Sequence, residues 1–445
     1  MVHGKERRII VGEHFYQPPR KGAHLRVQDI KTDPGDVNWN ERIAHESYVP
    51  QIRKGILSYT SFDFYTTMRQ EMDEISPGDV PDLESALRDR GVGDPFLHVL
   101  LPDLSYEDKY ILIESGKRVF AEQTGQQPLW FWAPETALDN ETLDVLSECG
   151  YIGVICAPEQ IDTNEGEVDN RPVRISLSGG GEMLLLAFDR PVSTSLAFDA
   201  KDNADRFAHD IVAPRFDNLP DTLPMVTWTD GETFGHHSPL GDYFLEYLVG
   251  TSLPTAGIAV LGINQITEIW GEDDFIEGSL NERSAWSCPH GDLQRWHGAC
   301  PCDNGFNGEW KSYFMDAVSN LNEQVTSLLE RVFDGDYAEE LVGDFDRAFS
   351  YEGDEQDINL SLLAAKVSSL AAMTSCGTFF DGPGTSGRIN MLFARQALEH
   401  LVDAGYRDEA EKLLNNFIVE LSGGIDPHSN LPLNEIFSDI LVLSE

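Results

Sequence analysis

Short runs of apolar residues, each ending in polar or acidic side chains, recur along roughly the first 300 residues of the chain. The clearest run is 223–228, which is followed by an acid, a glycine, a second acid and two histidines in the stretch Asp230–His237. Runs that are apolar throughout, rather than alternating, indicate parallel strands that are covered on both faces. Similar runs occupy residues 8–14, 96–102, 129–135, 151–158, 183–189 and 257–262.

Amphipathic segments lie between these runs, and polar residues stand repeatedly where a predicted strand ends. An α/β barrel presents its chemistry at this C-terminal rim of its strands. We therefore predict an α/β fold in which residues 1–305 form a catalytic barrel of βα units.

The periodicity changes after Trp310. Apolar residues spaced by three and four positions then predict one face of a long helix; they are Phe314, Val318, Leu321, Val325, Leu328 and Val332. Residues 358–373, 390–402 and 410–421 predict further helices. We therefore expect residues 306–445 to form a C-terminal α-helical bundle domain.

The charge of the chain restricts its partners. It carries 76 acidic against 32 basic residues, a formal net charge of −44, and the acids are spread along its length. Such a surface repels nucleic acid and anionic lipid, so we expect neither as a partner. The same composition is typical of proteins adapted to high salt, in which counterions screen the self-repulsion.

Segments that would direct the chain out of the cytoplasm are not evident. The first residues contain no apolar signal region, and no apolar run reaches the ~18 residues of a membrane span. Six cysteines in 445 residues do not make a disulfide scaffold. We expect a cytoplasmic protein with reduced thiols, and its oligomeric state stays open.

Two acids, Glu135 and Asp230, stand at the ends of predicted strands. Cleavage of a glycosidic bond with retention uses such a pair, one carboxylate as nucleophile and the other as general acid and base. Asp230-Gly231 also has the composition of a simple turn. Nearby tryptophans can stack on sugar faces or fill the core; they are Trp130, Trp132, Trp228, Trp286 and Trp296.

Five motifs, in this order, together resemble glycoside hydrolase family 57. They are His14–Pro18, Trp39–Ile43, Trp132–Ala137, Asp230–His237 and Ser287–Gly291. The chain looks most like the branch of bacterial and archaeal members with a His-Phe-Tyr-Gln-Pro first motif. The resemblance extends to about Asp381 and so covers most of the chain.

The resemblance implies a seven-stranded βα barrel with a helical C-terminal domain, acting on α-glucans with retention. It matches Glu135 to the nucleophile and Asp230 to the general acid and base. The candidate substrate-binding residues are His14, Gln17, Trp39, Glu41, His98, Trp132, Trp228, Glu232 and His290. This chemistry requires neither a metal nor another cofactor. Amylase, 4-α-glucanotransferase and branching activities all remain open, since they differ only in whether water or a sugar hydroxyl is the acceptor.

Two departures from the family accompany the resemblance. Gly12 stands where the family usually has a histidine, and Gly382–Gly387 follows Asp381 where the branch tends to have an acid.

Two other functions are compatible with the residues. A zinc-dependent α-mannosidase or polysaccharide deacetylase could use Asp230, His236 and His14 as ligands. A non-catalytic carbohydrate-binding protein is disfavoured, because both catalytic acids are present.

A second cluster combines metal-binding residue types: Cys288, His290, His297, Cys300 and Cys302. Thiolates and imidazoles are the ligands of tetrahedral zinc sites. The spacing is not that of the common zinc fingers, and the resemblance already assigns His290 to sugar binding. We therefore expect buried free thiols and no metal here.

Overall fold

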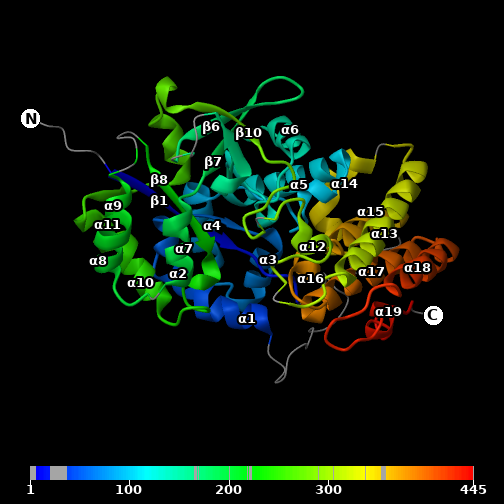
Figure 1. Cartoon of the computed structure of the whole chain (residues 1–445). Coiled ribbons are helices and arrows are strands. Elements are labelled where there is room, and N and C mark those ends of the chain that lie inside the picture. The colour runs from blue at the N-terminus through cyan, green and yellow to red at the C-terminus, as the bar shows by residue number, and fades with distance from the viewer. Residues whose placement is uncertain are drawn as a thin grey trace, which may run out of the picture. The chain divides into compact units, whose positions relative to one another are not determined.

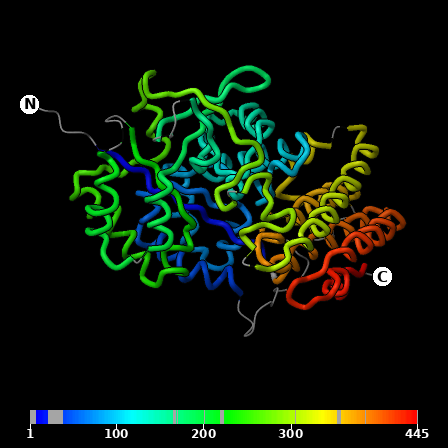
Figure 2. Tube along the Cα trace, in the orientation of Figure 1, coloured from blue at the N-terminus to red at the C-terminus, as the bar shows by residue number. Residues whose placement is uncertain are grey.

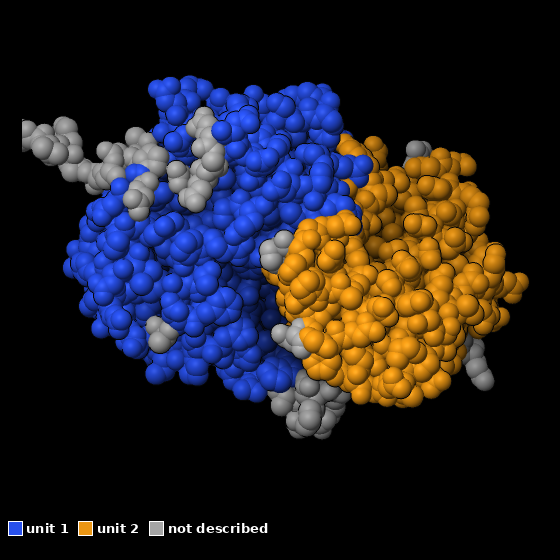
Figure 3. Space-filling view, viewed as in Figure 1, with its two compact units in different colours: residues 1–17, 39–95, 116–286 blue, residues 18–38, 96–115, 287–445 orange. Residues whose placement is uncertain are grey.

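The computed structural model describes residues 7–20, 38–164, 168, 170–199, 201–217, 219, 223–288, 290–303, 305–335, 337–351 and 357–443. The chain divides into two compact units, coloured separately in Figure 3. Unit 1 comprises residues 1–17, 39–95 and 116–286, and unit 2 comprises 18–38, 96–115 and 287–445. This division differs from the expected boundary after residue 305. Unit 2 begins its C-terminal part at Ser287 and also takes a segment, 96–115, from between two parts of unit 1.

The strands all belong to unit 1, among the residues that the structure describes. They are β1 (Arg7–Phe15), β2 (Ser61–Phe64), β3 (Trp130–Trp132), β4 (Gly153–Cys156), β5 (Ile161–Thr163), β6 (Pro172–Ser176), β7 (Glu182–Ala187), β8 (Met225–Asp230), β9 (Ile258–Val260) and β10 (Ile276–Leu280). Strand β1 lies at the centre of one sheet and pairs in parallel with β2, β8 and β9. The other sheet has the order β3-β4-β7-β6-β10-β5, with β3, β4 and β7 parallel.

Strand pairing alone does not give the closed seven-stranded barrel expected from the sequence, because the ladders fall into these two sheets. Single contacts nevertheless connect them. Gly91 and Gly93 make isolated parallel bridges to Phe62 of β2 and Phe131 of β3. On the other side, the Asp189 N–H donates to the Val226 carbonyl of β8 at 2.6 Å, directly after β7.

Side chains from both sheets share one apolar core. Its fully buried members are led by Ile10 of β1, Trp130 and Trp132 of β3, Leu186 of β7 and Trp228 of β8. The alternation along β1 explains this, since Ile9 and Val11 pack instead in a second cluster with residues of α7 and α10. Parallel strands that are covered on both faces need such continuous apolar sequences.

The helices of unit 1 are short. They are α1 (Trp39–Ile43), α2 (Val49–Arg53), α3 (Thr66–Ile75), α4 (Val80–Arg90), α6 (Asn140–Glu148), α7 (Arg190–Phe198), α8 (Ala204–Arg206), α9 (Ala213–Arg215), α10 (Gly241–Tyr247) and α11 (Leu253–Thr255). Single π-helical segments join α1 to α2, α8 to α9 and α10 to α11. In Figure 1, helices α8–α11 gather beside β1 and β8, and the trace in Figure 2 follows β1 through the middle of this unit.

Most of the predicted strands are confirmed, namely β1, β3, β4, β7, β8 and β9. The prediction of a strand over 96–102 is wrong, because that segment is irregular and ends in a turn at Leu101–Asp103 within unit 2. Strand β2 was not predicted, since the aspartate at its centre interrupts the apolar run that would have revealed it.

Unit 2 is helical, as the sequence predicts. Its helices are α12 (Gln294–His297), α13 (Trp310–Val332), α14 (Tyr337–Phe349), α15 (Ile358–Ala371), α16 (Cys376–Phe379), α17 (Gly384–Asp403), α18 (Arg407–Leu421) and α19 (Leu433–Ile436), and α5 (Tyr106–Thr124) begins here and ends in unit 1. Helix α15 is buried from Leu360 onward and packs against α13, α14 and α17. Its small and apolar residues on every face allow that central position. Within the described part of the chain, no helix combines the length and apolar composition needed to cross a membrane.

Candidate active site

Three ionisable residues lie side by side at the C-terminal end of the parallel strands. His14 of β1 is in register with Asp63 of β2 and with Asp230 of β8. Residues in register on parallel strands project from the same face of the sheet. The Nδ1 atom of His14 lies 2.6 Å from Oδ2 of Asp63, and both side chains are buried. The strands thus place an acid, an imidazole and a second acid in one row.

The imidazole in this row is charged at neutral pH. Desolvation lowers the pKa of His14, but the charge of Asp63 and its hydrogen bond outweigh this effect and raise the pKa to about 9. The ion pair of His14 with buried Asp63 therefore puts a fixed imidazolium beside Asp230.

Asp230 is the last residue of β8 and is half-buried. Desolvation raises the pKa of its carboxyl group to about 7, and the charges of Glu232 and Glu135 act in the same direction, whereas His14 opposes them. A carboxyl group that keeps its proton close to neutral pH can serve as a general acid. Glu135, one of these charges, is the other predicted catalytic acid.

Glu232 lies in the 3-10 turn Gly231–Thr233 directly after β8. Its Oε1 accepts hydrogen bonds from Gln17 Nε2 at 3.1 Å and from the Tyr48 hydroxyl. The turn itself is fixed because the Gly231 carbonyl accepts from Ser47 Oγ and from Gln51 Nε2. The structure thus brings together Gln17 and Glu232, two residues that the sequence predicted for substrate binding.

Glu135 lies in a 3-10 turn, Pro134–Thr136, directly after β3. Both Glu135 (φ 57°) and Thr136 (φ 51°) are in the left-handed region of backbone space. Residues with a side chain rarely adopt it, at a cost of about 1–3 kcal/mol each, and they do so most often at functional sites. The side chain of Glu135 is half-buried at the end of this turn.

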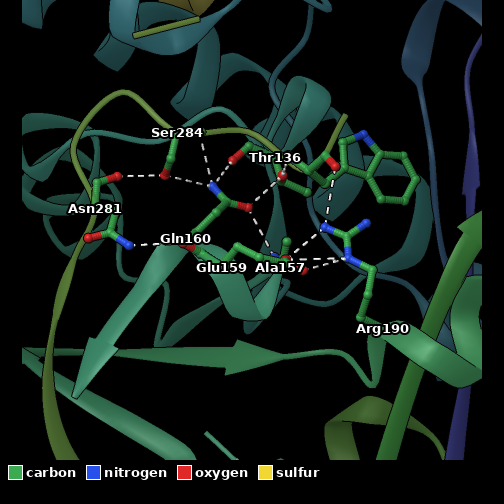
Figure 4. A network of polar contacts seen from close by, with 8 residues as sticks. Thr136, Ala157, Glu159, Gln160, Arg190, Asn281 and Ser284 are labelled. Atoms are coloured by element: carbon green, nitrogen blue, oxygen red, sulfur yellow. Dashed lines mark hydrogen bonds and ion pairs between the residues drawn. The ribbon is translucent and has the colours of Figure 1, made fainter. Parts of the chain in front are cut away.

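The side chain of Gln160 stabilises the backbone of the turn Pro134–Thr136 (Figure 4). Its Oε1 accepts from Thr136 Oγ1 and its Nε2 donates to the Thr136 carbonyl, each at 2.7 Å. The same amide bonds the Ala157 N–H at 3.0 Å and the Ser284 carbonyl at 3.0 Å. Gln160 is 1% exposed, so this network is screened from water.

Trp286 completes the support of the turn. Its N–H donates to Thr136 Oγ1 at 2.8 Å and to the Glu135 carbonyl at 3.2 Å. The Trp286 carbonyl in turn accepts from Arg190 Nη2, and that arginine pairs with Glu159 at 2.8 Å. The left-handed turn that presents Glu135 is therefore held by two segments that are distant in the sequence, 157–160 and 281–286.

Tryptophans Trp132 and Trp228 pack under the row of acids and are buried, at 0% and 1% exposure. Their rings stack with centroids 5.1 Å apart, and the Trp132 ring lies 5.6 Å from that of His14. A Cβ atom at Gly12 would lie 1.9 Å from the Trp228 ring. The glycine at this position, where the family usually has a histidine, is thus required by the ring on the neighbouring strand.

The other predicted site residues make contacts of different kinds. Trp39 and the exposed Glu41 are in α1, where the Trp39 ring contacts Arg42 and His236. His98 and His290 belong to unit 2. There His98 Nδ1 lies 2.8 Å from Ser375 Oγ, and His290 Nδ1 lies 3.3 Å from Cys302 Sγ.

The alternative metal site of Asp230, His14 and His236 is not assembled. His236 Nδ1 lies 2.6 Å from Glu46 Oε2, and His14 is held by Asp63. In the part of the chain that the structure describes, the residues grouped closely enough to bind a metal are three cysteines and His290, not this set.

Sequence reasoning missed several buried residues around the site: Asp63, Asp94, Glu13, Gln160 and Tyr65, whose ring lies 5.8 Å from that of His14. Asp94 is buried, and desolvation followed by the charge of Asp63 raises its pKa well above the usual value. Glu13 is buried on the opposite face of β1 from His14, and desolvation raises its pKa to about 8. An aspartate inside Ser-Phe-Asp-Phe was the one available signal, because a charge in an apolar run needs a partner.

Comparison with known proteins identifies a family with which the chain shares its sequence pattern. The model of glycosyl hydrolase family 57 matches residues 42–277, more than half of the chain. No curated protein sequence matches the chain.

Three solved structures are similar in fold. An exo-type maltose-forming amylase from Pyrococcus sp. ST04 superimposes with a TM-score of 0.75 and 17% identity, covering 94% of this chain and 83% of that one. A branching enzyme from Pyrococcus horikoshii has a TM-score of 0.66 and 14% identity, covering 98% and 94%. A 4-α-glucanotransferase from Thermococcus litoralis has a TM-score of 0.59 and 14% identity, and the match covers 90% of this chain and 60% of that enzyme.

Proposed function

The chain belongs to glycosyl hydrolase family 57, and we propose that it is a retaining enzyme that hydrolyses or rearranges α-glucans. The observation that carries this proposal is the row of His14, Asp63 and Asp230 at the strand ends, in which burial raises the pKa of Asp230 to about 7, together with Glu135 on a left-handed turn after β3. The structural relatives named above, an amylase, a glucanotransferase and a branching enzyme, support an α-glucan as the substrate.

In the first step, Asp230 donates its proton to the glycosidic oxygen while the Glu135 carboxylate attacks the anomeric carbon. The bond to the leaving sugar breaks as the bond to Glu135 forms, which gives a glycosyl-enzyme. In the second step, the Asp230 carboxylate removes a proton from water or from a sugar hydroxyl, and that oxygen displaces Glu135. Two inversions retain the α configuration.

The remaining residues bind and position the sugar in this proposal. The His14 imidazolium supplies a positive charge beside the reacting centre, where the carboxylates of Asp230 and Glu232 also lie. Gln17 and Glu232, joined at 3.1 Å, present an amide and a carboxylate to sugar hydroxyls. Trp132 and Trp228 pack beneath them. Trp39, Glu41 and His98 stay candidates for sugar binding.

We further infer that the parallel strands close into the seven-stranded barrel of the sequence prediction. The order would be β8-β1-β2, then residues 91–93, then β3-β4-β7. The bridges at Gly91 and Gly93, the hydrogen bond from Asp189 to Val226, and the core shared by both sheets support this closure. The segment 91–93 is simply too short to be a strand by its own hydrogen bonds.

The conditions in which the enzyme works follow from its charge. We propose that it acts in the cytoplasm of an organism with high internal salt, because a formal charge of −44 requires screening. Nucleic acid is not a partner in this proposal, for the same electrostatic reason.

Product analysis tests the function. The purified chain, in molar KCl, is incubated with maltoheptaose or amylose, and product lengths, reducing ends and branch linkages are measured. We expect shorter products with new reducing ends for hydrolysis, or new chain lengths or branches at constant reducing ends for transfer. Glu135→Gln should abolish both, and Glu148→Gln, exposed on α6, should not. A folded wild-type protein that leaves both glucans unchanged contradicts the proposal, as does a Glu135→Gln variant with wild-type turnover.

A further inference from the structure

Three cysteines and one histidine of unit 2 converge on a single point. The Sγ atoms of Cys288, Cys300 and Cys302 and Nδ1 of His290 all lie within 4.8 Å of one another. We propose that these four side chains bind a structural zinc ion, which the preference for free thiols drawn from the sequence spacing did not anticipate.

The separations between the ligand atoms match a tetrahedral ion. With zinc–sulfur bonds of about 2.3 Å and zinc–nitrogen bonds of about 2.0–2.1 Å, tetrahedral angles place neighbouring ligand atoms about 3.6–3.8 Å apart. The Cys288 and Cys300 sulfurs lie 3.6 Å apart, and His290 Nδ1 lies 3.8, 3.5 and 3.3 Å from the sulfurs of Cys288, Cys300 and Cys302.

The ligand set selects both the metal and its role. Three thiolates and one imidazole suit zinc, whereas carboxylates and carbonyls would suit magnesium or calcium. Four protein ligands fill a tetrahedral shell and leave no position for a reacting water, so the ion is structural rather than catalytic. His297, the fifth residue of the sequence cluster, is not part of the shell, because its Nε2 lies 2.8 Å from Asp103 Oδ2.

A disulfide does not explain this geometry. A disulfide joins two sulfurs at about 2.05 Å, whereas the Cys288 and Cys300 sulfurs lie 3.6 Å apart. A disulfide between two of the cysteines would also not explain why the third sulfur and the His290 imidazole lie at the same point.

Buried polar contacts outside the shell hold the second pair of cysteines in place. Asp303 Oδ2 accepts from the Cys300 N–H at 2.8 Å, and its Oδ1 pairs with Lys311 Nζ at 2.8 Å. Lys311 also donates to the Arg295 carbonyl, and neither Lys311 nor Asp303 is more than 4% exposed. Such contacts orient ligands in metal sites, and here they fix the ligand backbone to helix α13.

The segment that carries the four ligands explains how a metal ion would stabilise the fold. Between Ser287 and Glu309 the described residues contain little regular structure beyond the four-residue helix α12. Their backbone hydrogen bonds are those of short local turns, such as the bond from the Asp303 N–H to the Cys300 carbonyl at 2.9 Å. An ion held by residues 288, 290, 300 and 302 would close it into a compact loop.

Metal content of the full-length protein tests the proposal. The chain, purified without a histidine tag and without chelators, should contain about one zinc per molecule by mass spectrometry. After exchange with cobalt, its absorption spectrum should show thiolate-to-cobalt charge transfer and the intense visible bands of tetrahedral coordination. Iron in place of zinc, a Cys288–Cys300 disulfide, or a metal-free chain with a native melting curve would each overturn it.

Matched variants localise the ion. Cys302→Ser, at a half-buried ligand, should lose most of the zinc and melt at a lower temperature. Two control variants should keep about one zinc per molecule. They are Cys376→Ser, at a half-buried cysteine in α16 outside the cluster, and His297→Gln. Should Cys302→Ser fail to fold, release of zinc from the wild type by an organomercurial, in step with thiol titration, still decides. Zinc retained by Cys302→Ser, or zinc release that does not follow thiol titration, contradicts the assignment.

Discussion

At the scale of single residues, the proposed function depends on one carboxyl group, that of Asp230, whose pKa burial raises to about 7. Asp230 lies in a row with the His14–Asp63 ion pair and next to the carboxylates of Glu232 and Glu135. Burial among negative charges disfavours its ionised form, and the imidazolium only partly compensates. In the proposed function, this protonated carboxyl group is the acid that glycosidic cleavage requires.

The pH profile should report this proton. Asp230 must be protonated to donate, so kcat/KM should fall as pH rises through about 7, the value to which its pKa is raised. Because the charge of Glu232 contributes to that rise, Glu232→Gln should lower the pKa and move the basic limb to lower pH. Glu148→Gln, on α6, serves as the control and should leave the limb unmoved. A limb that stays in place or moves upward in Glu232→Gln would show that another group controls the rate.

Residue types at strand ends could be predicted, but their partners could not. Glu135 and Asp230 stand out because each follows an apolar run that indicates a strand. Asp63 and Asp94 are separated from them by many residues, and only the register of β1 with β2 and β8 brings Asp63 beside His14. Register depends on tertiary packing, which one sequence does not specify. The reason for Gly12 likewise became visible only with the Trp228 ring in place.

At the scale of elements, the support of the Glu135 turn comes from loops rather than strands. Gln160 lies in the turn that follows β4, and Ser284 lies in the segment after β10. The amide of Gln160 connects both to Thr136. A buried glutamine with both its oxygen and its nitrogen bonded to backbone or hydroxyl groups is a positioning residue, because it holds the turn without itself reaching substrate.

Removing that amide should impair catalysis more than binding. Gln160→Leu leaves the Thr136 carbonyl without its partner, so we expect kcat to fall about 10²-fold with KM little changed, since a shift of ~1 Å has effects of that size. The free energy of unfolding should fall by about 1–3 kcal/mol. Asn281→Ala, at the exposed edge of the same network, should lower the melting temperature slightly and spare kcat. A folded Gln160→Leu variant with wild-type kcat would remove the positioning role.

At the same scale, the helical half was more predictable than the sheets. Periodicity in three and four marks α13 and its end at Val332, and the segment of α15, rich in leucine and alanine, was also predicted as a helix. Strands β5, β6 and β10 were missed because they are short and partly exposed, so that they lack a continuous apolar run. The insertion of residues 96–115 into unit 2 has no local signal either, because it depends on long-range packing.

At the scale of the whole molecule, the few ammonium groups do not offset the surface acids. Lys311 and Lys366 are fully buried, where they pair with Asp303 at 2.8 Å and Asp108 at 2.6 Å. Lys109 is also buried, at 1% exposure. Some of the few lysine side chains are therefore buried in the core. The formal charge of −44 falls mainly on the surface.

Stability should therefore rise with salt. The Debye length is about 30 Å at 0.01 M and about 3 Å at 1 M, so molar salt removes the repulsion between distant carboxylates. Thermal melts in dilute KCl, intermediate KCl and multimolar KCl should show a steadily increasing midpoint, with activity increasing in parallel. A midpoint that stays constant or decreases across the series would contradict adaptation to salt and leave the acidic composition without this explanation.

The central claim is that Glu135 is the nucleophile and Asp230 the acid and base of a retaining reaction, and the stereochemistry of azide rescue tests it most directly. Glu135→Ala and Asp230→Ala are each incubated with an activated α-maltoside and sodium azide, and the anomeric configuration of the maltosyl azide is determined by NMR. In Glu135→Ala, azide replaces the nucleophile in a single displacement, so the product should be the inverted β-azide. In Asp230→Ala, Glu135 still forms the glycosyl-enzyme and azide then displaces it, so the product should be the retained α-azide. An α-azide from Glu135→Ala, or a β-azide from Asp230→Ala, would contradict the assignment of the two acids.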